Sequence, residues 1–342
     1  MTKVNIPEQF QTIDSIVQKV KQSEGVSQRQ ALVQVLATLN EQELTAKDKE
    51  VLSADSQLAM EKLFTIDWSS FSFQEKRHIL QLLILKADKE DKIPANEQLT
   101  PDGIGYLLGD LVAKTANVKK ANGQVATITD MTVGSANLLW TVQEVLGATD
   151  VEVKTTGIDV VDSQLALASV TADLLSDNQA DFFLGDVVNL PAGELLPADV
   201  VIGDLPIGYY PNEAPAGFVT AFKDGKSYAH FLMIEQALNL LKEDGWAYLV
   251  VPADILSGAH HESILKLLSN KAQLKAFLTL PQSFFQKKEQ QKAILVIRHS
   301  SATPKTEVML GQYPSVKESK ALEEFLQDLG DWGKLNKEKV RD

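Results

Sequence analysis

The sequence predicts an α/β protein in which a domain made only of helices precedes a doubly wound sheet of seven strands. Residues 1–95 carry apolar side chains at helical spacing and little strand pattern. From residue 100 onward, short β-branched runs alternate with helical patterns, which is typical of a parallel sheet with helices on both faces. We therefore expect a helical domain over residues 1–95, a sheet domain over 96–312, and a C-terminal helix and tail over 313–342.

Four helices are expected in the first part. Their apolar residues recur three and four positions apart, and Ser27 is placed to cap the second helix. A charged segment that contains Pro94 marks the expected end of this domain. The expected helices are the run from Phe10 to Val20, the run from Leu32 to Leu39, Lys47–Phe64 and Ser72–Lys86.

Seven strands are expected in the second part. In sheets of this kind ligands bind beyond the carboxyl ends of the strands, so the turns after the strands are where chemistry is sought. One more strand, Thr306–Leu310, and a helix, Lys317–Leu329, are expected near the C-terminus. The seven strands are Val125–Thr129, Val153–Ile158, Asp181–Leu184, Asp199–Ile202, Trp246–Val251, Leu274–Leu280 and Ala293–Arg298, and the helices among them are Ala136–Leu146, Ser163–Leu175, Ser227–Leu241 and His261–Ser269.

The charge of the chain is unevenly distributed. The formal net charge is -13, and residues 96–215 hold 4 basic and 17 acidic side chains. Non-specific binding of a polyanion needs a dense display of Lys and Arg, so such a surface is not expected. The acidic middle part favours a ligand that carries a positive centre.

No membrane, targeting or metal-binding signal stands out. No apolar run approaches the roughly 18 to 20 residues of a membrane span. The first residues lack the apolar core of a signal peptide, and the chain has no cysteine. His260 and His261 are adjacent without carboxylates at ligand spacing, so no metal site is expected. We expect a cytoplasmic protein without membrane association.

The turn after the first strand has features of a ligand-binding loop. Asp130 ends the strand, Gly134 lets a ligand approach the backbone, and the helix expected from Ala136 directs free N–H groups toward the loop. The G-x-G-x-x-G fingerprint of dinucleotide-binding proteins is absent. Taken alone, the turn fits a plain strand-to-helix connection equally well.

Acidic residues follow three consecutive strands. Asp159 comes after the second strand, where a carboxylate can accept hydrogen bonds from ribose hydroxyls, and Asp186 comes after the third. Any one of these aspartates could be a helix cap or a solvated residue. Three at the ligand edge favour a nucleoside-bearing cofactor that is not held through phosphate, so we expect S-adenosyl-L-methionine rather than NAD or ATP.

The fourth strand leads into DLPIGYYP at residues 204–211. A strand followed by Asp-x-Pro and aromatic residues resembles the Asn/Asp-Pro-Pro-aromatic motif of amino-group methyltransferases. The Asp130 loop is similar to that family's D-P-A-x-G-S/T-G-x loop, QLTP at 98–101 to its upstream Thr-Pro element, and PQSFF at 281–285 to a late segment. Over residues 96–300 the order and spacing resemble the adenine-N6 DNA methyltransferases, especially the methylation subunits of type I restriction systems.

The resemblance implies a Rossmann-like methyltransferase sheet over residues 96–312, S-adenosyl-L-methionine as cofactor and methyl transfer to adenine N6 of DNA. Asp204 and the carbonyl of Leu205 would accept the hydrogen bonds of the substrate NH2 group on the rigid turn made by Pro206. These acceptors orient the nitrogen lone pair and stabilise the positive charge that develops on it. The resemblance implies that the cofactor is bound by Thr100, Pro101, Asp130, Gly134, Asn137, Asp159, Asp186, Val187 and Asp204. It implies that the catalytic residues are Asp204, Leu205, Pro206 and Tyr209.

Several positions depart from the family pattern. The aromatic residue on which a flipped base stacks is absent at Ile207, and Tyr209 or Tyr210 could either replace it or pack the loop. The remaining departures are Met131 and Thr132 in place of Pro-Ala, Ala136 where a second glycine is common, and Leu205 in place of the first proline.

The methyl acceptor and the partners stay open at this point. The acidity of the chain weighs against DNA, as do the 44 residues after Arg298, which leave little chain for target recognition. Lys287, Lys288 and Lys292 form a small basic group that could touch phosphate or be a solvated loop. RNA, a protein amide or a small amine offers a similar amino group. A methyltransferase fold without activity, which binds a protein partner, for example through the helical domain, is the alternative from another class.

Overall fold

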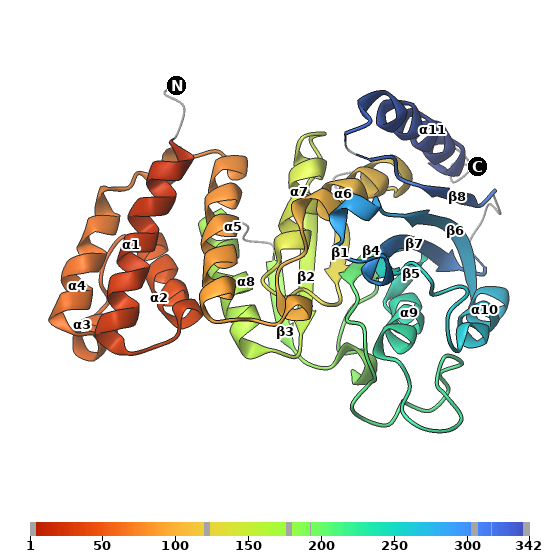
Figure 1. Cartoon of the computed structure of the whole chain (residues 1–342), viewed down its shortest axis with the longest axis horizontal. Helices are drawn as coiled ribbons and strands as arrows, with labels where there is room; N and C mark the ends of the chain where they lie inside the picture. The colour runs from red at the N-terminus through yellow and green to blue at the C-terminus, as the bar shows by residue number, and fades with distance from the viewer. Residues whose placement is uncertain are drawn as a thin grey trace.

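The computed structural model describes residues 5–119, 124–175, 180–191, 193–301, 307–315 and 317–337. A group of N-terminal helices stands at one end of a twisted sheet, and further helices cover the two faces of that sheet (Figure 1). Among the described residues, no helix is both long and apolar enough to span a bilayer.

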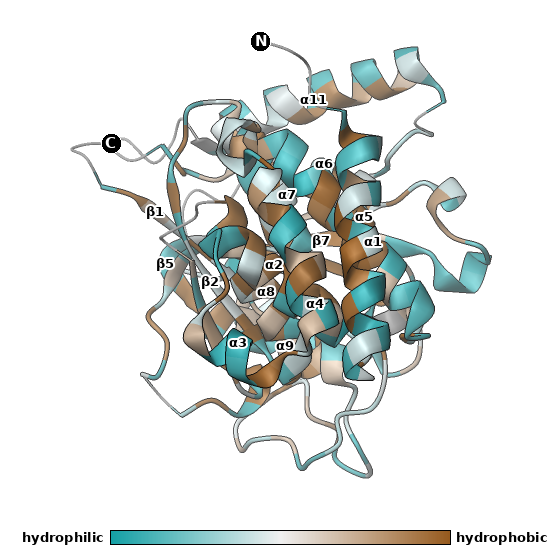
Figure 2. Cartoon of the chain, turned by 90° about the vertical axis from the view of Figure 1, so that its left-hand side faces the viewer, coloured by the Kyte–Doolittle hydropathy of each residue, from teal (hydrophilic) through white to brown (hydrophobic). Residues whose placement is uncertain are grey.

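The N-terminal helices begin at side chains that accept hydrogen bonds from their free N–H groups. Ser27, Thr45 and Ser72 each form a capping box with the residue three positions on. Apolar stripes run beside polar ones along these helices (Figure 2). Helices α2 (Gln28–Glu41) and α5 (Phe73–Glu90) pack against α8 (Asp162–Leu175) of the sheet region. The elements are α1 (Ile6–Glu24), α2 (Gln28–Glu41), α3 (Ala46–Val51), α4 (Ala54–Met60), α5 (Phe73–Glu90) and the 3-10 turns Glu61–Thr65, Trp68–Ser70 and Ala95–Glu97.

The single helix expected over Lys47–Phe64 is wrong, because the chain breaks it between α3 and α4. Leu52 is extended, with ψ of 143°, and Ser53 caps α4. Glu24 of α1 accepts hydrogen bonds from the Ser53 backbone N–H at 3.0 Å and from its hydroxyl at 2.7 Å. Such local bonds to serine compete with helix continuation, and the apolar periodicity of the sequence does not reveal them.

Among the described residues, eight strands form one sheet in the order β3-β2-β1-β4-β5-β7-β6-β8. The eighth is the additional strand expected near the C-terminus, which joins the sheet beside β6; Thr306 itself lies outside the described residues. Strand β7 runs antiparallel to β5 and β6, which corrects the expectation of a parallel sheet for this strand. The segment between β6 and β7 contains no α-helix that could return the chain to the other end of the sheet. The strands are β1 (Ala126–Asp130), β2 (Val153–Asp159), β3 (Ala180–Leu184), β4 (Ala198–Asp204), β5 (Leu241–Pro252), β6 (Ala272–Thr279), β7 (Lys292–His299) and β8 (Met309–Gln312).

The helices of the sheet region include one that the sequence analysis does not predict. Helix α6 buries Ile104, Leu108, Leu111 and Val112 at helical spacing, a pattern that was present in the sequence. The elements are α6 (Asp102–Thr115), α7 (Asn137–Gly147), α8 (Asp162–Leu175), α9 (Ala229–Asn239), α10 (His261–Asn270), α11 (Ser319–Lys337) and the 3-10 turns Val187–Asn189, Gln282–Phe284 and Lys288–Gln290.

Two apolar cores lie on the two faces of the sheet, because side chains alternate along each strand. In β4, Val200 and Ile202 join the core shared with the N-terminal helices, whereas Val201 joins the core of α9 and α10. The C-terminal α11 packs on α6, where the Lys114 ammonium donates to the carbonyl of Leu326 at 3.0 Å. The division into domains at residues 95 and 312 stays a prediction.

Candidate active site

Four aspartates lie at one edge of the sheet. Asp130, Asp159 and Asp204 are the last residues of β1, β2 and β4, and Asp186 lies two positions after β3. Because these four strands are parallel neighbours, their carboxyl ends meet at the same edge. The structure therefore brings together the acidic residues that the sequence analysis places beside a ligand.

Asp130 is fully buried at this edge. Its Oδ1 accepts the backbone N–H of Thr132 at 3.1 Å, while its Oδ2 has no hydrogen-bond partner among the described residues. Burial, together with the charges of Asp159 and Asp204, raises the pKa of Asp130 to about 8. A buried carboxylate oxygen without a partner is costly, so the position favours a ligand that brings N–H donors or positive charge.

Asp159 is held by the backbone of two loops. Its Oδ2 accepts the N–H of Gly134, and its Oδ1 accepts the N–H of Val161, each at 2.9 Å. Gly134 has φ of 52°, and no atom lies within 4 Å of the place where a Cβ would be. Val160 is 65% exposed beside them. A fixed carboxylate, an apolar side chain and open space beside a glycine suit a sugar and a flat ring.

Ala136 adopts a left-handed backbone conformation, which favours glycine, at the position where a second glycine is common in the family pattern. Its φ is 67° and its ψ is 13°, in the left-handed region, directly before α7. Its N–H donates to the carbonyl of Val133 at 2.7 Å, and its side chain is buried. The alanine therefore keeps the tight turn of the loop at a steric cost.

Both carboxylate oxygens of Asp204 have hydrogen-bond donors. The Thr100 hydroxyl donates to Oδ2 at 3.0 Å, and the Lys292 ammonium donates to Oδ1 at 2.5 Å. The side chains of Asp204 and Lys292 are 17% and 23% exposed. Thr100 is thus at the site, as predicted from the sequence, whereas Lys292 was expected in a basic group that touches phosphate or forms a solvated loop. The signal that could have found Lys292 is its position at the start of a strand that runs antiparallel and therefore begins at the carboxyl edge.

The turn after Asp204 is closely packed. Leu205 is buried, and its N–H donates to the carbonyl of Val250 at 3.0 Å. Gly203 has no room for a side chain, because a Cβ there would lie 2.9 Å from a neighbouring hydroxyl. Pro206 follows and restricts the backbone next to the Leu205 carbonyl. Asp204 and this carbonyl thus stand on a rigid turn.

The segment that carries Thr100 is fixed by side chains from two helices. Asn137 of α7 donates from Nδ2 to the Thr100 carbonyl at 2.7 Å and to Asp102 at 3.1 Å. Asp102 also accepts two hydrogen bonds from Arg77 of α5, each at 3.0 Å. Pro101 stands at the N-cap of α6. Thr100, Pro101 and Asn137 therefore lie together beside Asp204, and Arg77 and Asp102 are supports that the sequence analysis misses.

Asp186 is engaged with the protein itself. Its oxygens accept the Val188 N–H at 3.0 Å and the Tyr210 hydroxyl at 2.5 Å. Burial and the neighbouring carboxylate raise the pKa of Tyr210 to about 12. Val187 is buried in the core of α9. Contacts of Asp186 and Val187 with the cofactor stay predictions.

The two tyrosines after β4 have different surroundings. Tyr210 is buried against Asp186, whereas Tyr209 is 64% exposed. The Tyr209 ring lies 5.0 Å from the ring of Tyr228, and the two planes meet at 32°. Ile207 is also exposed. Of the two candidates for base stacking, Tyr209 is the one that presents its ring at the surface.

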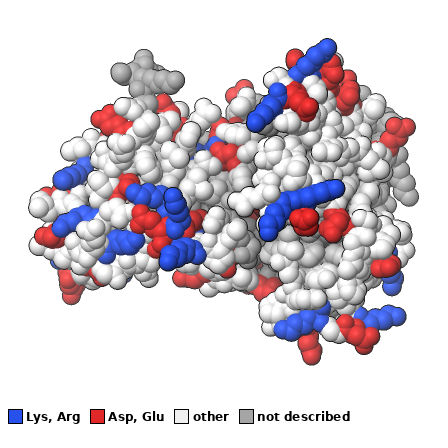
Figure 3. Space-filling view, viewed as in Figure 1, with Lys and Arg blue, Asp and Glu red and all other residues white. Residues whose placement is uncertain are grey.

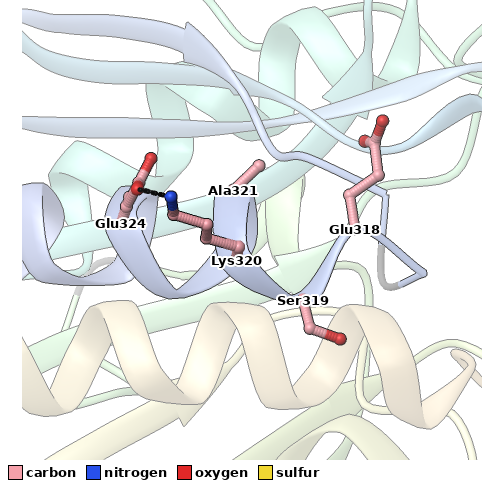
Figure 4. Close-up of a pocket in the computed structure, with 5 residues that line it drawn as sticks. All are labelled: Glu318, Ser319, Lys320, Ala321 and Glu324. Atoms are coloured by element: carbon pink, nitrogen blue, oxygen red, sulfur yellow. Dashed lines mark ion pairs between the residues drawn. The ribbon is translucent and has the colours of Figure 1, made fainter.

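Basic and acidic side chains are interspersed over the face of the molecule shown in Figure 3, and that face carries no broad basic surface among the described residues. In the same ranges, no group of three His, Cys, Asp or Glu side chains could hold a metal ion. A shallow hollow lies on the first turns of α11 and is crossed by the Lys320–Glu324 ion pair (Figure 4). It is formed by neighbouring residues at the start of one helix. It does not include the edge of the sheet that carries the four aspartates, which we call the acidic edge.

Solved structures share this fold. A Listeria monocytogenes protein assigned to the class I S-adenosylmethionine-dependent methyltransferases is 30% identical, with a TM-score of 0.84 over 96% of this chain and 98% of its own. The methyltransferase subunit of a type I restriction-modification system from Streptococcus thermophilus is 18% identical, with a TM-score of 0.63 over 94% of this chain and 74% of its own. Fold and site define a class I S-adenosyl-L-methionine-dependent methyltransferase.

The sequence comparisons give the family. The model of the N-6 DNA Methylase family matches residues 81–328, and the chain belongs to this family. The uncharacterised protein YtxK of Bacillus subtilis is 29% identical over 274 residues, which cover 79% of this chain and 80% of YtxK. The predicted fold class, the cofactor and the enzyme class are thereby confirmed, with eight strands in place of seven.

Proposed function

We propose that this protein methylates the N6 amino group of adenine in DNA, with Asp204 as the residue that holds the amino group. N-methyl transfer from S-adenosyl-L-methionine is the activity of its family. The observation that carries the residue assignment is the position of Asp204. It ends β4 on a rigid turn, at the same edge of the sheet as Asp130 and Asp159, and its carboxylate is fixed by Thr100 at 3.0 Å.

The residues of the acidic edge fit the cofactor. The unpaired buried oxygen of Asp130 suits the positively charged amino group of its methionine part, and the open space beside Gly134 leaves room for that part. Asp159 has lone pairs for the ribose hydroxyls, with Val160 against the adenine ring. When bound, the cofactor supplies a methyl group on a positively charged sulfur.

Further residues complete this assignment. Thr100 and Pro101 border the methionine end, and Asn137 acts by holding the Thr100 carbonyl at 2.7 Å. Asp186 and Val187 lie at the adenine end of the cofactor, where Tyr210 holds the carboxylate of Asp186 at 2.5 Å.

The catalytic residues orient the substrate rather than attack it. The Asp204 carboxylate accepts one N–H of the amino group, and the Leu205 carbonyl, held by Pro206, accepts the other. Two fixed acceptors direct the nitrogen lone pair, and the carboxylate stabilises the positive charge that develops on nitrogen. The exposed ring of Tyr209 offers a stacking surface for the base.

The test is transfer of a labelled methyl group to double-stranded DNA, with RNA and protein extracts as further acceptors. Asp204→Ala is expected to lower turnover about a hundredfold or more and to leave cofactor affinity within a few fold. The control is Asp181→Asn. Asp181 is an exposed aspartate near the start of β3, at the end of that strand away from the site. Unchanged turnover of Asp204→Ala would remove Asp204 from the mechanism, and absence of cofactor binding in the wild-type protein would favour a partner-binding role.

A further inference from the structure

A lysine side chain reaches along the edge of the sheet to the acceptor of the candidate active site. Asp204 ends β4, Lys292 begins β7, and β5 lies between these two strands. Neighbouring strands lie about 4.8 Å apart. The side chains of Lys292 and Asp204 therefore reach toward each other across two strand spacings, and the Lys292 ammonium lies 2.5 Å from Asp204 Oδ1.

The backbone of Lys292 is fixed on both sides. Lys292 pairs with Pro252 of β5, and its carbonyl accepts the N–H of Leu280 at 2.9 Å. Backbone pairing already joins β4 to β5 and β5 to β7, so the ion pair is not needed to hold these strands together. This arrangement points to a role of Lys292 at the site itself.

The chemistry of the pair favours a neutral substrate. An ammonium group carries three N–H donors. Within the described ranges, Asp204 is the one hydrogen-bond partner of the Lys292 ammonium, so two of its N–H donors remain for a ligand. The lysine and the aspartate together carry no net charge. A protonated alkylamine would meet the like charge of Lys292, whereas an uncharged planar amino group would not.

We propose that Lys292 is a specificity-determining residue that reads the atom next to the substrate amino group. Asp204 accepts from the amino group, and Lys292 donates to an adjacent acceptor atom. On adenine these two groups are the N6 amino group and the ring nitrogen N1. The inference rests on the proposed function and deepens it, because it selects a neutral amino group with a neighbouring acceptor and rejects lysine side chains.

The test compares adenosine with 1-deazaadenosine, in which a C–H group replaces the N1 acceptor. Binding of each nucleoside is measured by calorimetry to protein saturated with S-adenosylhomocysteine, which occupies the cofactor site. The wild-type protein is expected to bind adenosine about tenfold more tightly or better, the effect of one hydrogen bond to a charged donor. Lys292→Met is expected to bind the two nucleosides within about twofold of each other. Lys288→Met, an exposed lysine on the preceding loop, should keep the wild-type preference.

Each outcome decides the proposal. The proposal is overturned by the wild-type protein alone if that protein binds the two nucleosides equally or binds neither. The proposal is also overturned if Lys292→Met still binds adenosine more tightly than 1-deazaadenosine. If that variant loses affinity for both nucleosides to the same extent, Lys292 has a structural role. Methyl transfer to DNA is measured in parallel. A preference for adenosine without methyl transfer refutes the proposed DNA methylation and leaves the role of Lys292 intact. Methyl transfer without that preference supports the DNA methylation and refutes the role of Lys292.

Discussion

Arg77 of α5 donates to both carboxylate oxygens of Asp102, the first residue of α6, at 3.0 Å each. Its Nε lies 2.5 Å from a carboxylate oxygen of Glu144 on α7. Arg77 is only 3% exposed. Asp102 in turn accepts from Asn137, which holds Thr100, the hydrogen-bond donor to Asp204. One guanidinium group from the N-terminal helices is therefore connected, through hydrogen bonds, to the candidate catalytic carboxylate.

Arg77→Ala is expected to lower the free energy of unfolding by about 3 kcal/mol, because it leaves two largely buried carboxylates without their cation. The comparison is Lys86→Met on the same helix. The Lys86 ammonium lies 2.5 Å from Asp14 and 3.8 Å from Glu90, and its side chain is 34% exposed, against 4% for the Arg77 side chain. That variant should lose less than about 1 kcal/mol. Urea unfolding followed by circular dichroism measures both values, and equal losses would contradict the central position of Arg77.

Ala136→Gly is expected to leave the free energy of unfolding unchanged or to raise it by up to about 1 kcal/mol. Glycine relieves the left-handed strain at φ of 67°, and this gain offsets the loss of a buried methyl group and the greater freedom of the unfolded chain. Ala148→Gly at the other end of α7, where φ is -63°, lacks that strain and should lose about 0.5–1 kcal/mol. A larger loss in Ala136→Gly than in Ala148→Gly would argue against the strained turn.

The sequence predicts the sheet and its acidic edge because both depend on local patterns. Buried strands appear as β-branched runs, and an aspartate that ends such a run must lie at the carboxyl edge once neighbouring strands are parallel. The aspartates of β1, β2 and β4 and the loop at Gly134 were found in this way. The break before Ser53 was missed because it depends on Glu24 of another helix.

The supports of the site escape sequence reasoning because they join distant segments. Lys292 and Asp204 are 88 positions apart, and their contact depends on β7 pairing with β5. Tyr210 and Asp186 are 24 positions apart and meet only when the loop after β4 reaches the segment that follows β3. Such contacts follow from strand order and loop course, which apolar periodicity does not determine.

Tyr210→Phe is expected to lower the free energy of unfolding by about 1.5–3 kcal/mol, because the buried hydroxyl donates to a carboxylate. Tyr209→Phe is the matched control, since its exposed ring keeps its packing against Tyr228, and it should lose less than about 0.5 kcal/mol. Thermal unfolding of the two variants measures the difference. Similar melting temperatures would mean that the Tyr210 hydroxyl contributes little.

The buried Asp130 makes stability depend on pH. Its pKa is raised from an ordinary value of 3.8 to about 8, so between these values the folded protein keeps a proton that the unfolded chain releases. The folded state then binds more protons, and the contribution of Asp130 to stability falls as the pH rises from about 4 to about 8. Asp130→Asn removes this slope, so the variant should gain stability relative to the wild type across that window. Urea unfolding at pH 5, 7 and 9 measures the gain, and a constant difference between the two proteins would contradict the raised pKa.

The same carboxyl group should couple cofactor binding to proton release. A positively charged cofactor favours the ionised form of Asp130, so below pH 8 binding must expel the proton that the free protein holds. Affinity for S-adenosyl-L-methionine should therefore rise from pH 6 to pH 8 and then level off. Calorimetry at pH 7 in two buffers of different ionisation enthalpy measures the released proton directly. Asp130→Asn should bind without that release, because the amide has no proton to lose in this range; the same release in the variant would assign the proton to another group at the edge.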